Sequence, residues 1–254
     1  MALGDKFQAH LQHPRGSGVV HGMDHNRPAE TSVPPPRGWP RGTRHALVAA
    51  LVCWSGFAVM AILVLSDRLE AFDSAGLLYF RTGPDTLPWG PPALIGAVRG
   101  WTALGGTMVL NLLGISTVAA LLLIKLRREA TVLAATMLGG WLFNTTIKAV
   151  VGRPRPTLVS HLTEAGGPSF PSGHSFNSAV VYLSIALALA SLSARRGVRL
   201  SLIAGAALMT ALIALSRVWL GVHYPSDAIA GWLGGMAWAL TASTLHHRPA
   251  RGQA

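Results

Sequence analysis

Six runs of this sequence contain no Asp, Glu, Lys or Arg. Each is about 17 to 25 residues long, the length that an α-helix needs to cross a bilayer. One such run would fit a buried helix of a soluble protein, but six do not, because helices of soluble proteins need a polar face. The runs therefore predict an all-α fold, an integral membrane bundle of six transmembrane helices. They are residues 46–66, 100–124, 130–147, 175–194, 200–216 and 228–245.

The basic residues give the chain a net charge of +11, which would suit a nucleic-acid partner if they formed one patch. They lie instead in the N-terminal 45 residues, in alternate connections between the runs and near the C-terminus. This pattern follows the positive-inside rule, so both termini are expected in the cytoplasm of a multi-pass plasma-membrane protein. We therefore expect contact with anionic membrane lipids and no nucleic acid. Outside the N-terminal part, the groups are Lys125, Arg127 and Arg128; Arg195, Arg196 and Arg199; and Arg248 and Arg251.

The composition divides the chain into three parts. Residues 1–43 are rich in His, Arg, Gly and Pro, and they are predicted to form a disordered basic cytoplasmic tail. Residues 44–246 form the predicted membrane domain, and residues 247–254 a short cytoplasmic tail. The absence of an early apolar region argues against a cleavable signal peptide. Cys53, the one cysteine, lies inside the first run and has no partner for an intrachain disulfide.

The connections predicted to face outward carry their own signals. In residues 67–99, the stretch LEAFDSAGLLYF has apolar residues at helical spacing and predicts a short helix on the outer surface. In the GRPRP stretch, Gly152, Pro154 and Pro156 forbid a continuing helix, so the third span should end near Lys148. The third outward connection is short and leads directly into the sixth span.

Ionisable and polar residues gather at the outward ends of the last four spans. Such groups are costly at membrane depth and therefore indicate function. Three of the cations would form a trap for a polyanion, because guanidinium forks and an ammonium suit phosphate oxygens. The three are Lys148, Arg155 and Arg217, and the other members of the group are Arg153, Ser172, His174, His223 and Asp227.

Two local patterns add chemistry to this group. Ser172 and Gly173 precede the fourth span, where backbone amides of a helix start can bind an anion, although a plain N-cap has the same sequence. Asp227 follows His223 by four residues and can turn back to its imidazole, which would fix the tautomer and leave the other nitrogen free to attack. A structural His–Asp pair remains the alternative. His174 is placed to protonate a leaving oxygen.

Taken in order, these residues resemble the motifs of the type 2 phosphatidic acid phosphatase family, kin to the vanadium haloperoxidases. KAVVGRPRP, from Lys148 to Pro156, matches the pattern Lys, six residues, Arg-Pro. PSGH ends at His174, and SRVWLGVHYPSD matches Ser-Arg, five residues, His, three residues, Asp. The resemblance covers roughly residues 44–246, and the ordered triple is far more specific than any one motif.

The resemblance implies a role for each motif residue. His223 would be the nucleophile that forms a phosphohistidine, Asp227 would orient it, and His174 would protonate the leaving group and later activate water. The family needs no metal and no cofactor, and no carboxylate cluster suited to Mg²⁺ is visible in the outward segments. The phosphoryl oxygens would be held by Lys148, Arg155, Ser172, the Gly173 amide and Arg217.

The substrate implied is a lipid phosphate or diphosphate held at the outer, extracytoplasmic surface. Undecaprenyl diphosphate is the preferred candidate, while phosphatidylglycerophosphate, phosphatidic acid and phosphoryl transfer to a second lipid remain open. An anion or lipid transporter is the alternative from another class, although transporter sites lie near the membrane midplane. Glu164, the one acidic residue of residues 149–173, either is solvated or faces the head group. The oligomeric state is not predicted.

Overall fold

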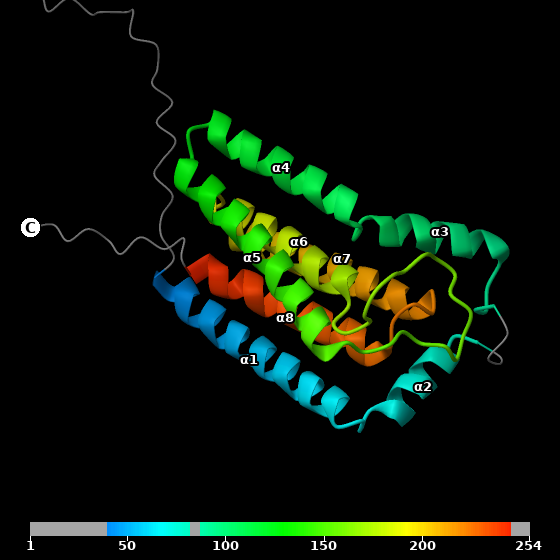
Figure 1. The fold of residues 1–254 in the computed structure, drawn as a ribbon. Helices are drawn as coiled ribbons and strands as arrows, with labels where there is room; N and C mark the ends of the chain where they lie inside the picture. Colours follow the sequence, from blue (N-terminus) through cyan, green and yellow to red (C-terminus); the bar gives the residue numbers. More distant parts are fainter. Residues whose placement is uncertain (1–39, 82–86, 245–254) are drawn as a thin grey trace, which may run out of the picture. The chain divides into compact units, whose positions relative to one another are not determined.

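A computed structural model describes residues 40–81 and 87–244, which include almost none of the two predicted tails. Within these ranges the chain is all-helical, as predicted, and its only strand-like pairing is an isolated bridge between Arg81 and Pro88. Figure 1 shows the long helices running side by side, with α2 and α3 at one end of them. The eight helices are α1 (Pro40–Leu65), α2 (Glu70–Leu78), α3 (Pro92–Ala103), α4 (Thr107–Leu123), α5 (Arg127–Val151), α6 (Gly173–Ser191), α7 (Arg196–Trp219) and α8 (Pro225–Thr244).

Five of the helical segments are long and apolar enough to cross a membrane. They are α1 from Arg44, α3 and α4 taken together, α5, α6 and α7. Large apolar side chains are exposed along α1, α4, α5 and α7, among them Met108 and Val150. Such a surface would be unstable in water and is normal against lipid. The protein is therefore a multi-pass membrane protein.

Helix α8, which corresponds to the predicted sixth span, does not belong to those five. It lies at the centre of the bundle, packing against α1, α6, α7, α5 and α2. Eleven of its twenty residues are buried. A helix enclosed by protein has little contact with lipid. Helix α8 can therefore be rich in Gly, Ala, Ser and Thr and still be stable within the bundle.

The second predicted span, residues 100–124, is not one continuous helix. The chain forms α3, turns at Leu104–Gly106 and continues as α4. Gly105 lies close to α7, since a Cβ at this position would come within 2.5 Å of Ile213 Cγ2. The turn also places this segment beside His174. The prediction missed the break because the composition on both sides of it is equally apolar.

The end of the third span agrees with the prediction from its Gly and Pro residues. Helix α5 stops at Val151, and Gly152 follows with a φ of 61°. In this left-handed conformation, which suits glycine, the Gly152 amide still donates to the Lys148 carbonyl at 3.0 Å. Helix α5 therefore ends here, and the chain continues as the segment that crosses the end of the bundle.

Helices α6 and α8 approach each other closely because α8 presents glycines to α6. A Cβ on Gly231 would lie 2.6 Å from the Ser172 carbonyl oxygen, and one on Gly235 would lie 2.3 Å from that of Phe176. The Ser172 amide also donates to the Asp227 carbonyl at 3.0 Å. Small residues at this contact therefore join the start of α6 to the start of α8.

The short helix predicted in LEAFDSAGLLYF is present as α2, but it is not merely a surface helix. It packs against α7 and α8. Its inner face buries Leu77 completely and leaves Asp73 only 1% exposed. A carboxylate on the buried face of an amphipathic helix requires a partner, and that partner belongs to the candidate site.

Candidate active site

Three segments distant in sequence meet at one end of the bundle. They are the segment from α5 to α6, the start of α6, and the turn from α7 to α8 (Figure 1). The first is held in place by backbone contacts, with Ser169 N donating to Arg153 O at 2.8 Å and Leu162 N to Leu220 O at 2.9 Å. All eight residues predicted for the site lie at this end.

The geometry around His223 defines the centre of the site. Its Nδ1 lies 3.4 Å from Asp227 Oδ2, and its Nε2 lies 3.1 Å from an Arg155 guanidinium nitrogen. A guanidinium only donates hydrogen bonds, so Nε2 accepts and the proton belongs on Nδ1, which faces the carboxylate. At 3.4 Å the Nδ1–Asp227 contact is longer than a normal hydrogen bond, and Nδ1 has no hydrogen-bond partner among the described residues.

His223 is held as a neutral imidazole. It lies in the turn between α7 and α8 and is 2% exposed. Burial lowers its pKa to about 4, although Asp227 acts in the opposite direction and the charges of Arg155 and Arg217 add to the lowering. A neutral ring with its Nε2 lone pair directed away from Asp227 is the form that can act as a nucleophile.

The start of α6 carries the second part of the site. Ser172 is fully buried, and its hydroxyl has no hydrogen-bond partner among the described residues. A Cβ on Gly173 would lie 3.6 Å from Lys148 Cε, so the ammonium side chain passes next to the first turn of α6. Lys148 donates to the Pro168 carbonyl at 2.7 Å. The Lys148 side chain thus lies next to the start of α6, where backbone amides and the unpaired Ser172 hydroxyl could contribute to binding an anion.

Arg217 and His174 complete the group from the side of α3. Arg217 is 3% exposed and donates to Thr102 Oγ1 at 3.1 Å, while its Nε has no partner among the described residues. His174 lies near the turn between α3 and α4 and interacts electrostatically with Arg217, His223, Arg155 and Lys148. A buried guanidinium with an unused donor is a favourable place for an anionic oxygen.

Arg153 has a different environment from the three cations of the predicted trap. Its guanidinium forms ion pairs with Asp73 and Asp227, both at 2.7 Å. Burial by itself lowers the pKa of Arg153, but Asp227 and Asp73 outweigh this and raise it. Arg153 is therefore already neutralised, whereas the described residues provide no ion pair for Lys148, Arg155 or Arg217.

Sequence reasoning missed Asp73 and Thr102 as parts of this site. Asp73 had a detectable signal, because it lies in line with Leu69 and Leu77 on the apolar face of its helix. Thr102 had none, since a threonine in an apolar run is ordinary. Arg81, also missed, supports the turn from α7 by donating to the Trp219 carbonyl at 3.3 Å.

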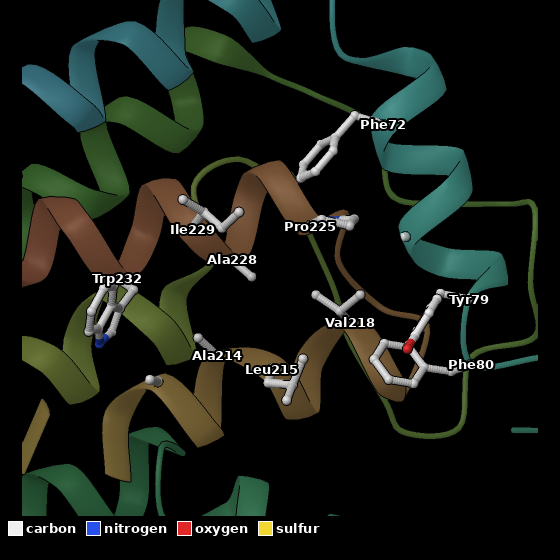
Figure 2. A pocket seen from close by; sticks show the side chains of 12 residues that line it. Phe72, Tyr79, Phe80, Ala214, Leu215, Val218, Pro225, Ala228, Ile229 and Trp232 are labelled. Carbon is white, nitrogen blue, oxygen red and sulfur yellow. The ribbon is translucent and has the colours of Figure 1, made fainter. Parts of the chain in front are cut away.

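An apolar cavity of about 370 Å³ is lined in part by Val218 and Pro225, which are close in sequence to Arg217 and Asp227. Figure 2 shows it between α2, α7 and α8, with Val218 and Pro225 among the side chains that line it. Aromatic side chains of α2 and α8, including Phe72 and Trp232, line it. None of the eight predicted site residues is part of its wall. A lining of this kind accepts hydrocarbon and rejects charge.

Comparison with known proteins agrees with the motifs. Residues 129–251 match the model of the PAP2 superfamily. Phosphatidylglycerophosphatase B of Bacillus subtilis is 36% identical over 98 residues, which are 37% of this chain and 47% of that protein, so the chain spans about half of its length. Decaprenylphosphoryl-5-phosphoribose phosphatase of Mycobacterium tuberculosis is 33% identical over 147 residues, covering 55% of this chain and 73% of that protein.

A solved structure extends the likeness to the fold. The crystal structure of a transmembrane PAP2-type phosphatidylglycerolphosphate phosphatase from Bacillus subtilis superposes with a TM-score of 0.67. The match has 24% sequence identity and covers 76% of this chain and 93% of that one. With three ordered motifs, a helical membrane bundle and a relative matched over most of its length, the chain belongs to the PAP2 superfamily.

Proposed function

We propose that this protein is a membrane-embedded phosphatase that hydrolyses a lipid phosphate or diphosphate through a phosphohistidine at His223. The observation that carries the proposal is the arrangement of the His223 ring, with Asp227 behind Nδ1 and Arg155 in front of Nε2. A phosphoryl group entering beside Nε2 would take over the guanidinium as a donor. The phosphoryl oxygens would then accept the hydrogen bond that Arg155 gives to His223 Nε2, and the Nε2 lone pair would become free to attack.

In the first step, the Nε2 lone pair of His223 forms a bond to phosphorus while the bond to the leaving oxygen breaks. Once the anionic phosphate lies among the cations, its negative charge favours the protonated form of His174. That form gives its proton to the leaving oxygen, so the product leaves as an alcohol or as a lipid phosphate. Lys148, Arg155, Arg217, the Ser172 hydroxyl and the Gly173 amide stabilise the equatorial oxygens, where charge is spread in the transition state.

In the second step, His174 is neutral and accepts a proton from water as the water oxygen attacks phosphorus. The N–P bond breaks, inorganic phosphate leaves and His223 regains its lone pair. The Nδ1 proton stays on His223 and points toward the Asp227 carboxylate throughout. The negative charge of Asp227 stabilises the positive charge that the ring gains when Nε2 is bonded to phosphorus. No metal is needed, because the cationic side chains supply the charge that Mg²⁺ provides elsewhere.

The identity of the lipid substrate is a separate part of the proposal. The relatives by their names act on phosphatidylglycerophosphate and on decaprenylphosphoryl-5-phosphoribose. The cavity in Figure 2 supports a substrate with a long hydrocarbon chain, since it offers apolar volume next to the phosphate-binding end. Undecaprenyl diphosphate, phosphatidylglycerophosphate, phosphatidic acid and the decaprenyl ribose phosphate are therefore the candidates. Transfer to a lipid acceptor instead of water would use the same residues.

The test is phosphate release from these lipids by the purified protein in detergent, with EDTA present. His223→Ala should be inactive on every substrate and trap no acid-labile phosphoenzyme. His174→Ala should lose about 10²- to 10⁴-fold on a lipid monophosphate, whose alkoxide needs a proton. It should lose less on p-nitrophenyl phosphate, whose phenolate leaves readily.

His161→Ala is the matched control, because His161 is an exposed histidine of the segment between α5 and α6 and is not one of the proposed site residues. It should retain near wild-type rates. A phosphoenzyme that persists in His223→Ala would contradict the role proposed for His223. Equal losses on both substrates in His174→Ala would contradict the role proposed for His174. Abolition by EDTA with rescue by Mg²⁺ would contradict the mechanism as a whole.

A further inference from the structure

We infer that Asp73 of α2 is a positioning residue for the nucleophile, because it competes with Asp227 for the guanidinium of Arg153. The inference rests on the proposed function and adds to it a residue outside the three motifs. Asp73 touches neither His223 nor the cations of the trap, so it acts through Arg153 and Ser226.

The contacts form a continuous chain from α2 to the nucleophile. Asp73 Oδ2 accepts from Arg153 and from the Ser226 hydroxyl, both at 2.7 Å, and Oδ1 accepts from the Ser226 amide at 2.9 Å. The other end of the Arg153 guanidinium donates to Asp227 Oδ1 at 2.7 Å and to Ser226 Oγ at 2.8 Å. Asp227 then uses Oδ2 for the Tyr224 amide, at 3.0 Å, and for His223.

This arrangement divides the work between the two oxygens of Asp227. Oδ1 accepts from Arg153, and Oδ2 accepts from the Tyr224 amide and faces His223. Because Arg153 is shared between two carboxylates, its charge is not concentrated on Asp227, and Asp227 stays a strong acceptor for the Nδ1 proton. Without the negative charge of Asp73, Arg153 would draw Asp227 toward itself and weaken its hold on His223.

A purely structural role of Asp73 predicts a different result in the double variant. Asp73 also joins α2 to the first turn of α8 through Ser226, so its loss could act only by loosening that contact. In that case a second change that removes Arg153 would loosen the cluster further. If the charge balance on Asp227 is what matters, removing Arg153 should instead relieve the defect caused by removing the charge of Asp73.

The experiment compares Asp73→Asn, Arg153→Gln and the double variant in purified full-length protein, on one lipid phosphate. Asn has the shape of Asp and keeps one acceptor oxygen, while its NH2 group takes the place of the other, so the variant removes the charge together with one accepting position. We expect Asp73→Asn to lower kcat by about 10- to 100-fold, the range found for groups that orient a catalytic ligand, with KM little changed. The double variant should have a higher kcat than Asp73→Asn alone.

Glu70→Gln is the matched control, since Glu70 is an exposed acid on the same helix, and it should keep the wild-type kcat. A double variant no more active than Asp73→Asn, or a loss in Asp73→Asn that falls on KM, would overturn the inference. So would a normal kcat in Asp73→Asn. These outcomes are distinct from failure of the proposed function, which would show as a wild-type protein that releases no phosphate or as an active His223→Ala.

Discussion

At the scale of single residues, the site works by giving chemically similar groups different surroundings. His223 is enclosed and neutral, with Arg155 on one nitrogen and Asp227 near the other. Arg153 is paired with two carboxylates, while Arg155 makes its other hydrogen bonds to the Val222, Gly166 and Gly167 carbonyls. Carbonyls hold a guanidinium in place without neutralising it, so Arg155 retains its full charge for a phosphate.

The environment of His223 predicts a pH dependence with a definite sign. Its pKa is lowered to about 4, so the ring is neutral above that value and activity should fall as pH drops toward it. Arg155→Met removes one of the positive charges that lower this pKa. The acid limb of kcat/KM, which reports the free enzyme, should therefore move to higher pH in Arg155→Met.

Arg155→Lys is the matched control for that profile, since it keeps the charge and should keep the limb near its wild-type position. The groups whose charges act on His223 are Asp227, Arg155 and Arg217, and His174 lies beside them. Using one substrate for all variants removes the contribution of the substrate's own ionisation. An acid limb that does not move in Arg155→Met would contradict this account of the pKa.

At the scale of elements, the position of the phosphate-binding turn depends on how closely α6 and α8 approach. The starts of both helices meet where Gly231 faces the Ser172 carbonyl, next to the bond between Ser172 N and Asp227 O. Ser172 and Asp227, which we propose bind the phosphate and orient the nucleophile, are thus fixed by one contact. Any residue larger than glycine at this contact must move one of the two.

Gly231→Ala should therefore reduce activity and stability together. The new Cβ would lie 2.6 Å from a backbone oxygen that cannot rotate away. Overpacking of this kind costs about 1 to 3 kcal/mol, so the melting temperature in detergent should fall, and kcat with it. Gly205→Ala in α7, where a Cβ meets nothing within 4 Å, should leave activity unchanged and be neutral or slightly stabilising. Equal behaviour of the two variants would count against the close contact.

At the scale of the whole molecule, the ends of the bundle differ in chemistry. The end with the α4–α5 and α6–α7 turns carries Lys125, Arg127, Arg195 and Arg196, and the positive-inside rule predicts that this end is cytoplasmic. The opposite end holds the candidate site and its free cations. A site at that end would meet lipid head groups on the extracytoplasmic surface, with the cavity beside α2 available to their chains.

Single cysteines test this orientation in a Cys53→Ala background. Ser160→Cys, at an exposed position of the segment between α5 and α6, should react with an impermeant thiol reagent in intact cells. Ala194→Cys, exposed in the turn between α6 and α7, should react only after the membrane is opened. Both substitutions are small, so each protein should still be active. The reverse pattern of labelling would invert the proposed topology.

The membrane helices and the candidate site residues could be predicted from local features of the sequence. Uncharged runs predict membrane helices because hydropathy is a local property, and Gly152 with two prolines ended α5 because backbone restrictions are local too. The motif residues could be assigned to helix ends for the same reason. His223 and Asp227 could be paired because they are four residues apart.

Contacts between residues far apart in the chain could not be predicted from the sequence and follow from how the helices pack. The pairing of Asp73 with Arg153 joins residues 80 positions apart, and it separates Arg153 from the free cations. The break between α3 and α4 and the enclosure of α8 likewise depend on neighbouring helices. Hydropathy and spacing describe each segment alone, whereas the charge state of a buried site depends on what packs against it.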